Sequence, residues 1–140
     1  MNTDLKDVYD VIVLGAGAGG MTAAVVAATE GLETLVVEKT DFVGGTTSFS
    51  GGMCWVPNNF QQGDVGSTDT LEQAEKYLNE IAGDGAGAGL RGCFLQRGPE
   101  AVDYLNKNSD VKLVPLAFYP DYYPDAVGAT TGGRVMEPLP

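Results

Sequence analysis

Histidine is absent from this 140-residue chain, and cysteine occurs only twice, at Cys54 and Cys93. Without histidine, the chain cannot build a histidine-based catalytic triad or a histidine metal site from its own residues. The two cysteines lie far apart and form no CxxC pair, so we predict neither a metal site nor a disulfide framework. We expect both to be free thiols in a reducing compartment, which favours a cytoplasmic location.

Basic residues are scarce as well. The chain has eight Lys and Arg residues and 19 Asp and Glu residues, for a formal net charge of −11. The electrostatic field of this negative charge repels phosphate backbones and anionic lipid headgroups, so we predict that the chain binds neither nucleic acid nor a membrane surface.

Signals for secretion or membrane insertion are also missing. Residues 1–7 contain no basic stretch followed by an apolar one, so we expect no signal peptide. Residues 11–28 form a nearly unbroken apolar run that is long enough to span a bilayer. Four glycines interrupt it, which favours a strand, a turn and a buried helix over a transmembrane segment.

The interrupted run predicts a βαβ unit. We expect strands at Tyr9–Leu14 and Thr34–Val37 and, between them, a helix at Gly20–Ala28 that ends at Gly31. The strands are rich in β-branched residues and the helix is apolar nearly all round. We therefore predict that both faces of the strands and most of the helix are buried.

The rest of the chain predicts a mostly helical segment. A capping-type start at Thr70, with Gln73 three residues later, precedes helical spacing over residues 71–82. We predict two further helices, over residues 88–96 and from Gly98-Pro99 onward, then strands at residues 111–117 and 134–136.

The predicted organisation is a βαβ unit with a glycine-rich loop over 1–60, a helical segment over 61–110 and a loop and strand segment over 111–140. Because two parallel strands seldom make an independent domain, we expect this to be the front portion of a longer polypeptide, leading toward a substrate domain.

The turn after the first strand carries the spacing of a dinucleotide-binding motif, GxGxxG. The first glycine permits a tight turn, the second leaves room for a pyrophosphate, and the third lets the helix pack on the strand. The helix N-terminus then directs N–H groups at the phosphates. The predicted phosphate-binding residues are Gly15, Ala16, Gly17, Ala18, Gly19 and Gly20.

Glu38, followed by Lys39, ends the second strand, where a carboxylate can accept hydrogen bonds from the adenosine ribose. Its charge disfavours a 2′-phosphate and hence NADP. A second segment rich in glycine and hydroxyl groups follows, and we predict that it lies along a flavin, which favours FAD over NAD, with Phe49 and Trp55 packed beside it. The cofactor residues predicted there are Gly44, Gly45, Thr46, Thr47, Ser48, Ser50, Gly51 and Gly52.

These glycine motifs, together with Trp55-Val56-Pro57, resemble the flavoprotein superfamily of fumarate reductase and succinate dehydrogenase. The segments at residues 118–124 and 131–138 resemble its 3-ketosteroid Δ1-dehydrogenases in particular. The resemblance implies an α/β fold with an incomplete Rossmann-type FAD-binding domain. It implies a flavin-dependent oxidoreductase in which a 3-ketosteroid loses a proton beside its carbonyl and a hydride to the flavin N5, with a separate electron acceptor.

By the same resemblance, Tyr122 sits beside the substrate and supports a tyrosine base through a hydrogen bond. That base lies further along the chain in the family, so this segment alone is expected to be inactive. We expect aromatic packing roles for Tyr119 and Tyr123, and a surface or structural role for Arg134 ahead of a phosphate contact. The alternatives are a fumarate reductase-like or other FAD-dependent oxidoreductase, and a non-catalytic nucleotide-binding remnant.

Overall fold

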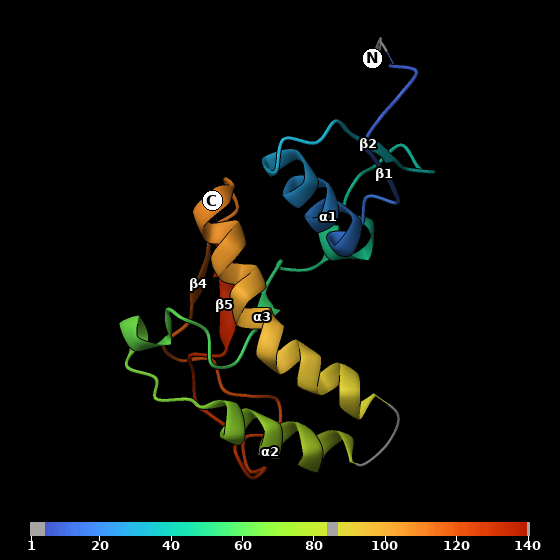
Figure 1. The fold of residues 1–140 in the computed structure, drawn as a ribbon. Helices are drawn as coiled ribbons and strands as arrows, with labels where there is room; N and C mark the ends of the chain where they lie inside the picture. Colours follow the sequence, from blue (N-terminus) through green and yellow to red (C-terminus); the bar gives the residue numbers. More distant parts are fainter. Residues whose placement is uncertain (1–4, 84–86, 140) are drawn as a thin grey trace. The chain divides into compact units, whose positions relative to one another are not determined.

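The computed structural model describes residues 5–83 and 87–139. The chain divides into two compact units, Met1–Gly52 and Met53–Pro140, which are described here one at a time (Figure 1). The first four residues, which belong to the segment in which we expect no signal peptide, lie outside the described part. Among the described residues, no helix combines the length and the apolar character needed to cross a membrane.

The first unit is a β-strand, a helix and a second β-strand. β1 (Val11–Leu14) pairs in parallel with β2 (Thr34–Val37), and α1 (Ala18–Thr29) connects them. Gly31 follows α1 with a φ of +83°, which a glycine adopts without strain. The βαβ prediction is confirmed, with β1 two residues shorter at its start than expected.

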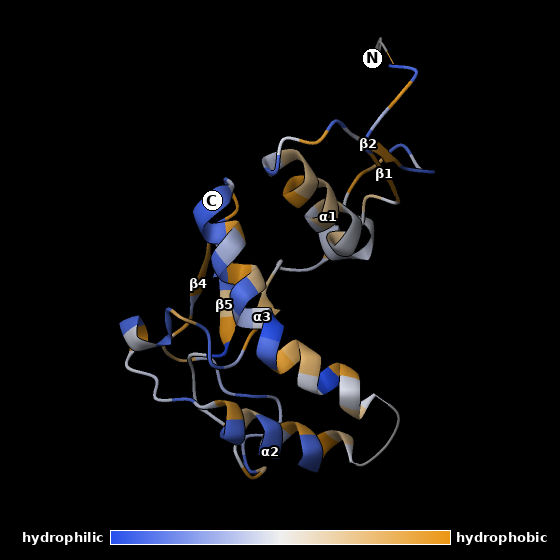
Figure 2. Ribbon diagram, viewed as in Figure 1, coloured by the Kyte–Doolittle hydropathy of each residue, from blue (hydrophilic) through white to orange (hydrophobic). Residues whose placement is uncertain are grey.

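Burial in this unit differs from the prediction. Val13 is buried in β1, but its neighbours Ile12 and Leu14 are 57% and 81% exposed. In α1, Ala24 and Ala27 are the buried residues. The prediction of strands buried on both faces is wrong for this chain, because α1 packs on the sheet and no other described helix makes comparable contact with it. Figure 2 shows how apolar β1 and β2 nevertheless are.

The second unit combines a small antiparallel sheet with two long helices. The strands β3 (Cys54–Trp55), β5 (Val135–Pro138) and β4 (Leu113–Pro115) lie in the order β3-β5-β4. β3 and the short 3₁₀ helix η2 (Gln62–Val65) have no counterpart in the sequence prediction. The apolar core of this unit consists of Val56, Val102, Leu113 and Met136.

The helices of the second unit confirm one prediction and correct another. α2 (Leu71–Ala82) begins as predicted, with the Thr70 hydroxyl oxygen accepting a hydrogen bond of 3.2 Å from the Gln73 N–H. α3 (Ala88–Asn108) is one continuous helix where we predicted two. Pro99 lies inside it rather than in a first turn, and its ring is buried. This burial helps to offset the missing backbone hydrogen bond that normally disfavours proline within a helix.

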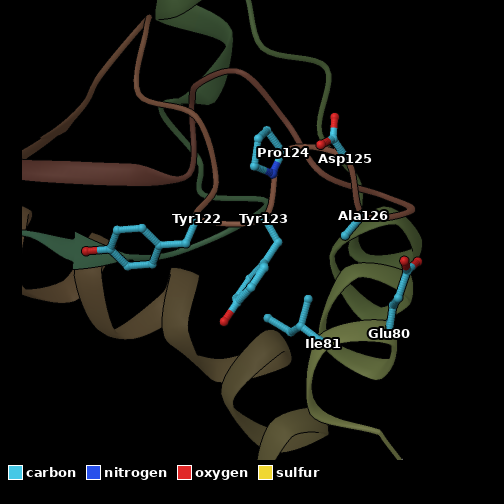
Figure 3. Close-up of a pocket in the computed structure, with 7 residues that line it drawn as sticks. All are labelled: Glu80, Ile81, Tyr122, Tyr123, Pro124, Asp125 and Ala126. Atoms are coloured by element: carbon cyan, nitrogen blue, oxygen red, sulfur yellow. The ribbon is translucent and has the colours of Figure 1, made fainter.

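A long loop connects β4 to β5 and is held together at its base. The Leu116 carbonyl accepts from the Gly133 N–H at 2.8 Å, and the Tyr119 N–H donates to the Thr131 carbonyl at 3.0 Å. The loop therefore leaves and re-enters the sheet as a closed hairpin. Tyr122 and Tyr123, two of the tyrosines that the sequence singled out, lie toward its tip (Figure 3).

Candidate functional site

The predicted glycine turn lies between β1 and α1. The Gly15 N–H donates to the Val37 carbonyl at 2.8 Å, and Gly15 has a φ of +97°. A Cβ on Gly20 would lie 1.9 Å from the Gly15 carbonyl oxygen. The fold itself therefore requires both glycines. Gly15 allows the bend, and Gly20 allows the helix to pack closely on the turn.

Gly17 has a different reason to be glycine. It is the N-cap of α1, its φ of −74° is open to any residue, and no side chain caps the helix there. A Cβ on Gly17 would meet no protein atom within 4 Å. Packing within the chain thus does not require this glycine, whereas a phosphate approaching the helix N-terminus does. The residues of the turn fit a dinucleotide.

Glu38 points into this turn. Its Oε2 accepts from the Ala16 N–H at 2.8 Å, and its Oε1 accepts from the Thr40 N–H and hydroxyl, each at 3.0 Å. The Ala16 N–H, followed by the Thr40 donors, holds the pKa of Glu38 below its usual range. A carboxylate has about four acceptor positions, so an ionised Glu38 keeps capacity for a sugar hydroxyl.

The second glycine segment packs directly on the first. The Gly44 N–H donates to the Ala16 carbonyl at 2.7 Å. A Cβ on Gly45 would lie 3.2 Å from the Gly17 Cα, and the φ of Gly45 is +54°. The two motifs, read separately from the sequence, thus meet within one unit.

The hydroxyl groups of that segment fall into two classes. Part of the segment forms the 3₁₀ helix η1 (Gly45–Phe49). The Ser48 and Ser50 hydroxyls donate to backbone carbonyls of this helix at 2.8 Å. Thr46 and Thr47 make no side-chain hydrogen bond to any described residue, so their hydroxyls are the donors that a ligand could use. The remaining predicted residues lie in the first turn of α1 or in the loops: Ala18, Gly19, Lys39, Gly51 and Gly52.

The two aromatic residues predicted to pack beside the flavin have different surroundings. Phe49 is 93% exposed, so its ring is accessible to a ligand. Trp55 belongs to the second unit, where its ring stacks 6.3 Å from the ring of Phe94 and lies 5.9 Å from that of Tyr77. Flavin packing thus stays a prediction for Phe49, whereas Trp55 has protein rings as its packing partners.

Tyr122 lies at the tip of the loop between β4 and β5. The residue is 89% exposed. Figure 3 shows Tyr123 directed toward Ile81 of α2, while Tyr122 projects away from it. Both tyrosines border an open depression of about 600 Å³, which residues 80–81 and 122–126 line.

Beneath this loop is an ion cluster that the sequence prediction missed. Arg134 is fully buried, and its guanidinium donates to both carboxylate oxygens of Asp69 at 2.6 and 2.9 Å and to Asp121 at 2.8 Å. Its Cζ lies 5.6 and 5.5 Å from the ring centroids of Trp55 and Tyr77. The prediction of a surface role for Arg134 is wrong, and its structural role is confirmed. No local motif marks the cluster, because its members come from distant parts of the chain.

Comparison with known proteins identifies a family model and several relatives that match this chain. Residues 10–138 match the model of a family described as "FAD binding domain". The 3-oxosteroid 1-dehydrogenase of Mycolicibacterium smegmatis is 46% identical over 94% of this chain, which covers 23% of that protein. The 4-oxocyclohex-2-ene-1-carboxylate 5-dehydrogenase of Sinomonas cyclohexanicum is 43% identical over 92% of this chain, which covers 22% of that protein.

Among solved structures, the 3-ketosteroid delta1-dehydrogenase of Sterolibacterium denitrificans, in complex with 1,4-androstadiene-3,17-dione, superposes with a TM-score of 0.82 at 44% identity. The match covers 96% of this chain and 24% of that one. The chain thus spans about a quarter of the length of the relatives it matches. With the family model matched over almost the whole chain, this protein belongs to the FAD binding domain family.

Proposed function

We propose that this chain is the FAD-binding part of a longer flavoenzyme that introduces a double bond into the ring of a 3-ketosteroid, beside the carbonyl. The observation that carries the proposal is the contact between the Glu38 carboxylate and the Ala16 N–H, which joins the expected ribose-binding group to the expected phosphate-binding turn. The 46% identical relative from M. smegmatis, named as a 3-oxosteroid 1-dehydrogenase, supports the substrate class.

Each part of the first unit has a task in this proposal. The turn from Gly15 to Gly20, of Rossmann type, binds the pyrophosphate at the start of α1, where N–H groups and the helix dipole favour negative charge. Glu38 accepts the ribose hydroxyls. The segment from Gly44 to Gly52 lies along the flavin and offers the hydroxyls of Thr46 and Thr47.

FAD, when bound, supplies the acceptor for a hydride from the substrate carbon. The chain's own contribution to the chemistry is Tyr122 in the second unit. In this proposal its hydroxyl supports, through a hydrogen bond, a base contributed by the remainder of the enzyme, and the 89% exposure of Tyr122 leaves it open to such a partner. A tyrosine base has an ordinary pKa of about 10 and depends on such help near neutral pH. The electrons leave the flavin to a separate acceptor, and the enzyme works in the cytoplasm.

A smaller cyclic ketone is the second candidate substrate. The S. cyclohexanicum relative, 43% identical, is named for a 4-oxocyclohexene carboxylate. Such a substrate shares the ketone and the ring of a steroid but carries a carboxylate. An anion-binding side chain in the rest of the enzyme therefore distinguishes the two classes.

Flavin binding is tested on the chain itself. We expect Glu38→Ala to weaken FAD binding, measured by fluorescence titration, by about tenfold or more, because the ribose loses a charged acceptor. Asp41→Ala removes a nearby exposed carboxylate and serves as the matched control. Equal FAD affinity of both variants would contradict the ribose role of Glu38.

Substrate class is tested on the full-length enzyme. We expect turnover of a 3-ketosteroid to exceed that of a 4-oxocyclohexanecarboxylate, with product identified by mass spectrometry as two hydrogens lighter. The reverse preference assigns the smaller ketone, and turnover of neither rejects the proposal. Tyr122→Phe should slow the preferred reaction while leaving the flavin spectrum unchanged.

A further inference from the structure

We infer that the buried cluster of Arg134, Asp69 and Asp121 is a positioning device for Tyr122. The cluster holds the backbone of the loop on both sides of Tyr122, so that its exposed ring is presented in one place. The task assigned to Tyr122 rests on the proposed function, but the anchoring of the loop is a property of this chain alone.

Asp121, directly before Tyr122, ties together the two arms of the loop. Its Oδ1 accepts from the Trp55 indole N–H at 2.6 Å, and its Oδ2 accepts from Arg134 at 2.8 Å and from the Thr130 N–H at 2.9 Å. Its own N–H donates to the Thr130 carbonyl at 3.1 Å. One carboxylate thus connects β3, the start of β5 and both arms of the loop.

Beyond Tyr122, the tip of the loop is attached to α2. The Tyr123 N–H donates to the Tyr77 hydroxyl at 3.3 Å, and the Val127 N–H donates to Glu80 at 2.7 Å. Arg134 reaches the same arm, donating to the Gly128 carbonyl at 2.8 Å. At Gly128 the backbone lies so close to α2 that a Cβ would fall 2.3 Å from the Gln73 carbonyl oxygen.

Tyr122 itself takes no part in this network. Its hydroxyl bonds to no described residue, and its ring projects away from α2 (Figure 3). Exposed side chains in loops are usually carried on weakly held backbone. Here an exposed ring directly follows Asp121, a residue that is only 4% exposed. That contrast supports the inference that the network fixes the backbone from which the Tyr122 ring projects.

Stability alone is a weak explanation of the cluster. It holds one arginine and two aspartates, and its excess negative charge is offset by N–H donors from Asn58, Thr130 and Trp55. Apolar residues of similar volume are often as stabilising as a buried ion cluster. What they lack is the directional hydrogen bonding that sets the path of a loop.

Asp121→Asn is the variant that separates these roles. An amide has one acceptor oxygen, whereas Asp121 uses both of its oxygens as acceptors. In the variant, an NH₂ group therefore faces either the Trp55 indole N–H or the donors of Arg134 and Thr130. The side-chain volume is kept, but one side of the loop loses its attachment. Val102→Ala, a truncation in the core of the same unit, is the control for general destabilisation.

The first measurement is amide hydrogen exchange on the chain itself. The informative amides are those of Tyr123 and Val127, because their acceptors on α2 remain in Asp121→Asn. In Asp121→Asn we expect the exchange of these two amides to accelerate by about tenfold or more relative to the exchange of amides in β5. In Val102→Ala the ratio between the two exchange rates should stay as it is in the parent. Unchanged exchange of both amides in Asp121→Asn would overturn the inference.

The second measurement is a double-mutant cycle in the full-length enzyme, with kcat expressed per bound flavin. We expect Asp121→Asn to lower kcat by about tenfold to a hundredfold, and to have little further effect when Tyr122→Phe is already present. The effects of Val102→Ala and Tyr122→Phe on kcat should multiply, because the two residues act independently. If Asp121→Asn also multiplies with Tyr122→Phe, Asp121 does not act through Tyr122. Absence of steroid turnover in the parent enzyme rejects the proposed function instead, while the exchange measurement still decides whether the loop is anchored.

Discussion

The two units of this protein differ in what forms their candidate sites: backbone groups in the first unit and side chains in the second. In the first unit the site is made of backbone: a glycine turn, a helix N-terminus and a second glycine segment, with Glu38 as the charged contact among them. In the second unit the candidate residue is the exposed Tyr122, and the loop that carries it is held by buried side chains, among which Arg134 connects Asp69 and Asp121. A backbone site depends on where side chains are absent, whereas a side-chain site depends on which ones meet.

The difference extends to how each unit is stabilised. The buried apolar residues described in the first unit are Val13, Ala16, Ala24 and Ala27, and much of its sheet remains exposed. The second unit has its own apolar core and its own buried ion cluster. We therefore expect substitutions at buried charges to reduce the stability of the second unit most, and substitutions in the turn between β1 and α1 to affect the first unit.

The largest effect is expected for Arg134→Ala. It leaves the carboxylates of Asp69 and Asp121 buried without their cation, which typically costs about 3–5 kcal/mol. Trp55, the only tryptophan of the chain, contacts the cluster, so its fluorescence reports unfolding in denaturant. Arg97→Ala, which removes an exposed ion pair with Glu100, should change the unfolding free energy by less than about 1 kcal/mol. Similar losses in both variants would show that the cluster has no special weight.

A smaller but more selective effect is expected at the glycine turn. Gly20→Ala places a methyl group against the Gly15 carbonyl oxygen, and such overpacking typically costs about 1–3 kcal/mol. We expect it to reduce both the thermal stability of the first unit and FAD binding. Gly17→Ala, whose methyl group meets no protein atom, should reduce FAD binding and leave the thermal melt by circular dichroism nearly unchanged. If both variants lose stability equally, Gly17 also serves the fold.

The pH dependence of the first unit should reflect Glu38. Donors from Ala16 and Thr40 lower the pKa of this carboxyl, so the folded state binds its proton less readily than the unfolded state. The resulting stabilisation is complete above the ordinary glutamate pKa of about 4.3, and it is lost as the pH falls through the lowered folded value. Glu38→Gln should therefore be less stable than the parent at pH ~7, with the difference shrinking in strongly acidic buffer. A constant difference across this range would exclude ionisation of Glu38 as the cause.

The smallest effect on stability is expected for Tyr122→Phe. Because the ring is mostly exposed and its hydroxyl bonds to no described residue, the unfolding free energy should change by no more than about 0.5 kcal/mol. Chemical denaturation followed by Trp55 fluorescence measures this directly. A larger loss would mean that the hydroxyl contributes to the fold, which would weaken its assignment to chemistry.

The elements that were predicted correctly have local causes. The βαβ unit follows from an apolar run interrupted at regular glycine positions, and the start of α2 follows from one side chain, Thr70, capping the N–H of Gln73. α3 was divided wrongly at Pro99, because proline normally ends a helix and only burial by the surrounding unit offsets its cost. Arg134 was misplaced for a similar reason: its partner Asp69 lies 65 residues away in the sequence.

The amino-acid sequence alone determined the glycine turn between β1 and α1, because the absence of a side chain at a given position affects which backbone geometry is open to it, whatever surrounds it. It also determined Glu38 as the partner of that turn, since the length of one βαβ unit brings them together. Only the tertiary structure decided that Ile12 and Leu14 are exposed, that Trp55 packs on Tyr77 and Phe94, and that Asp121 is anchored beneath Tyr122. Burial and long-range ion pairing depend on which distant segments meet, and residue spacing carries no record of that.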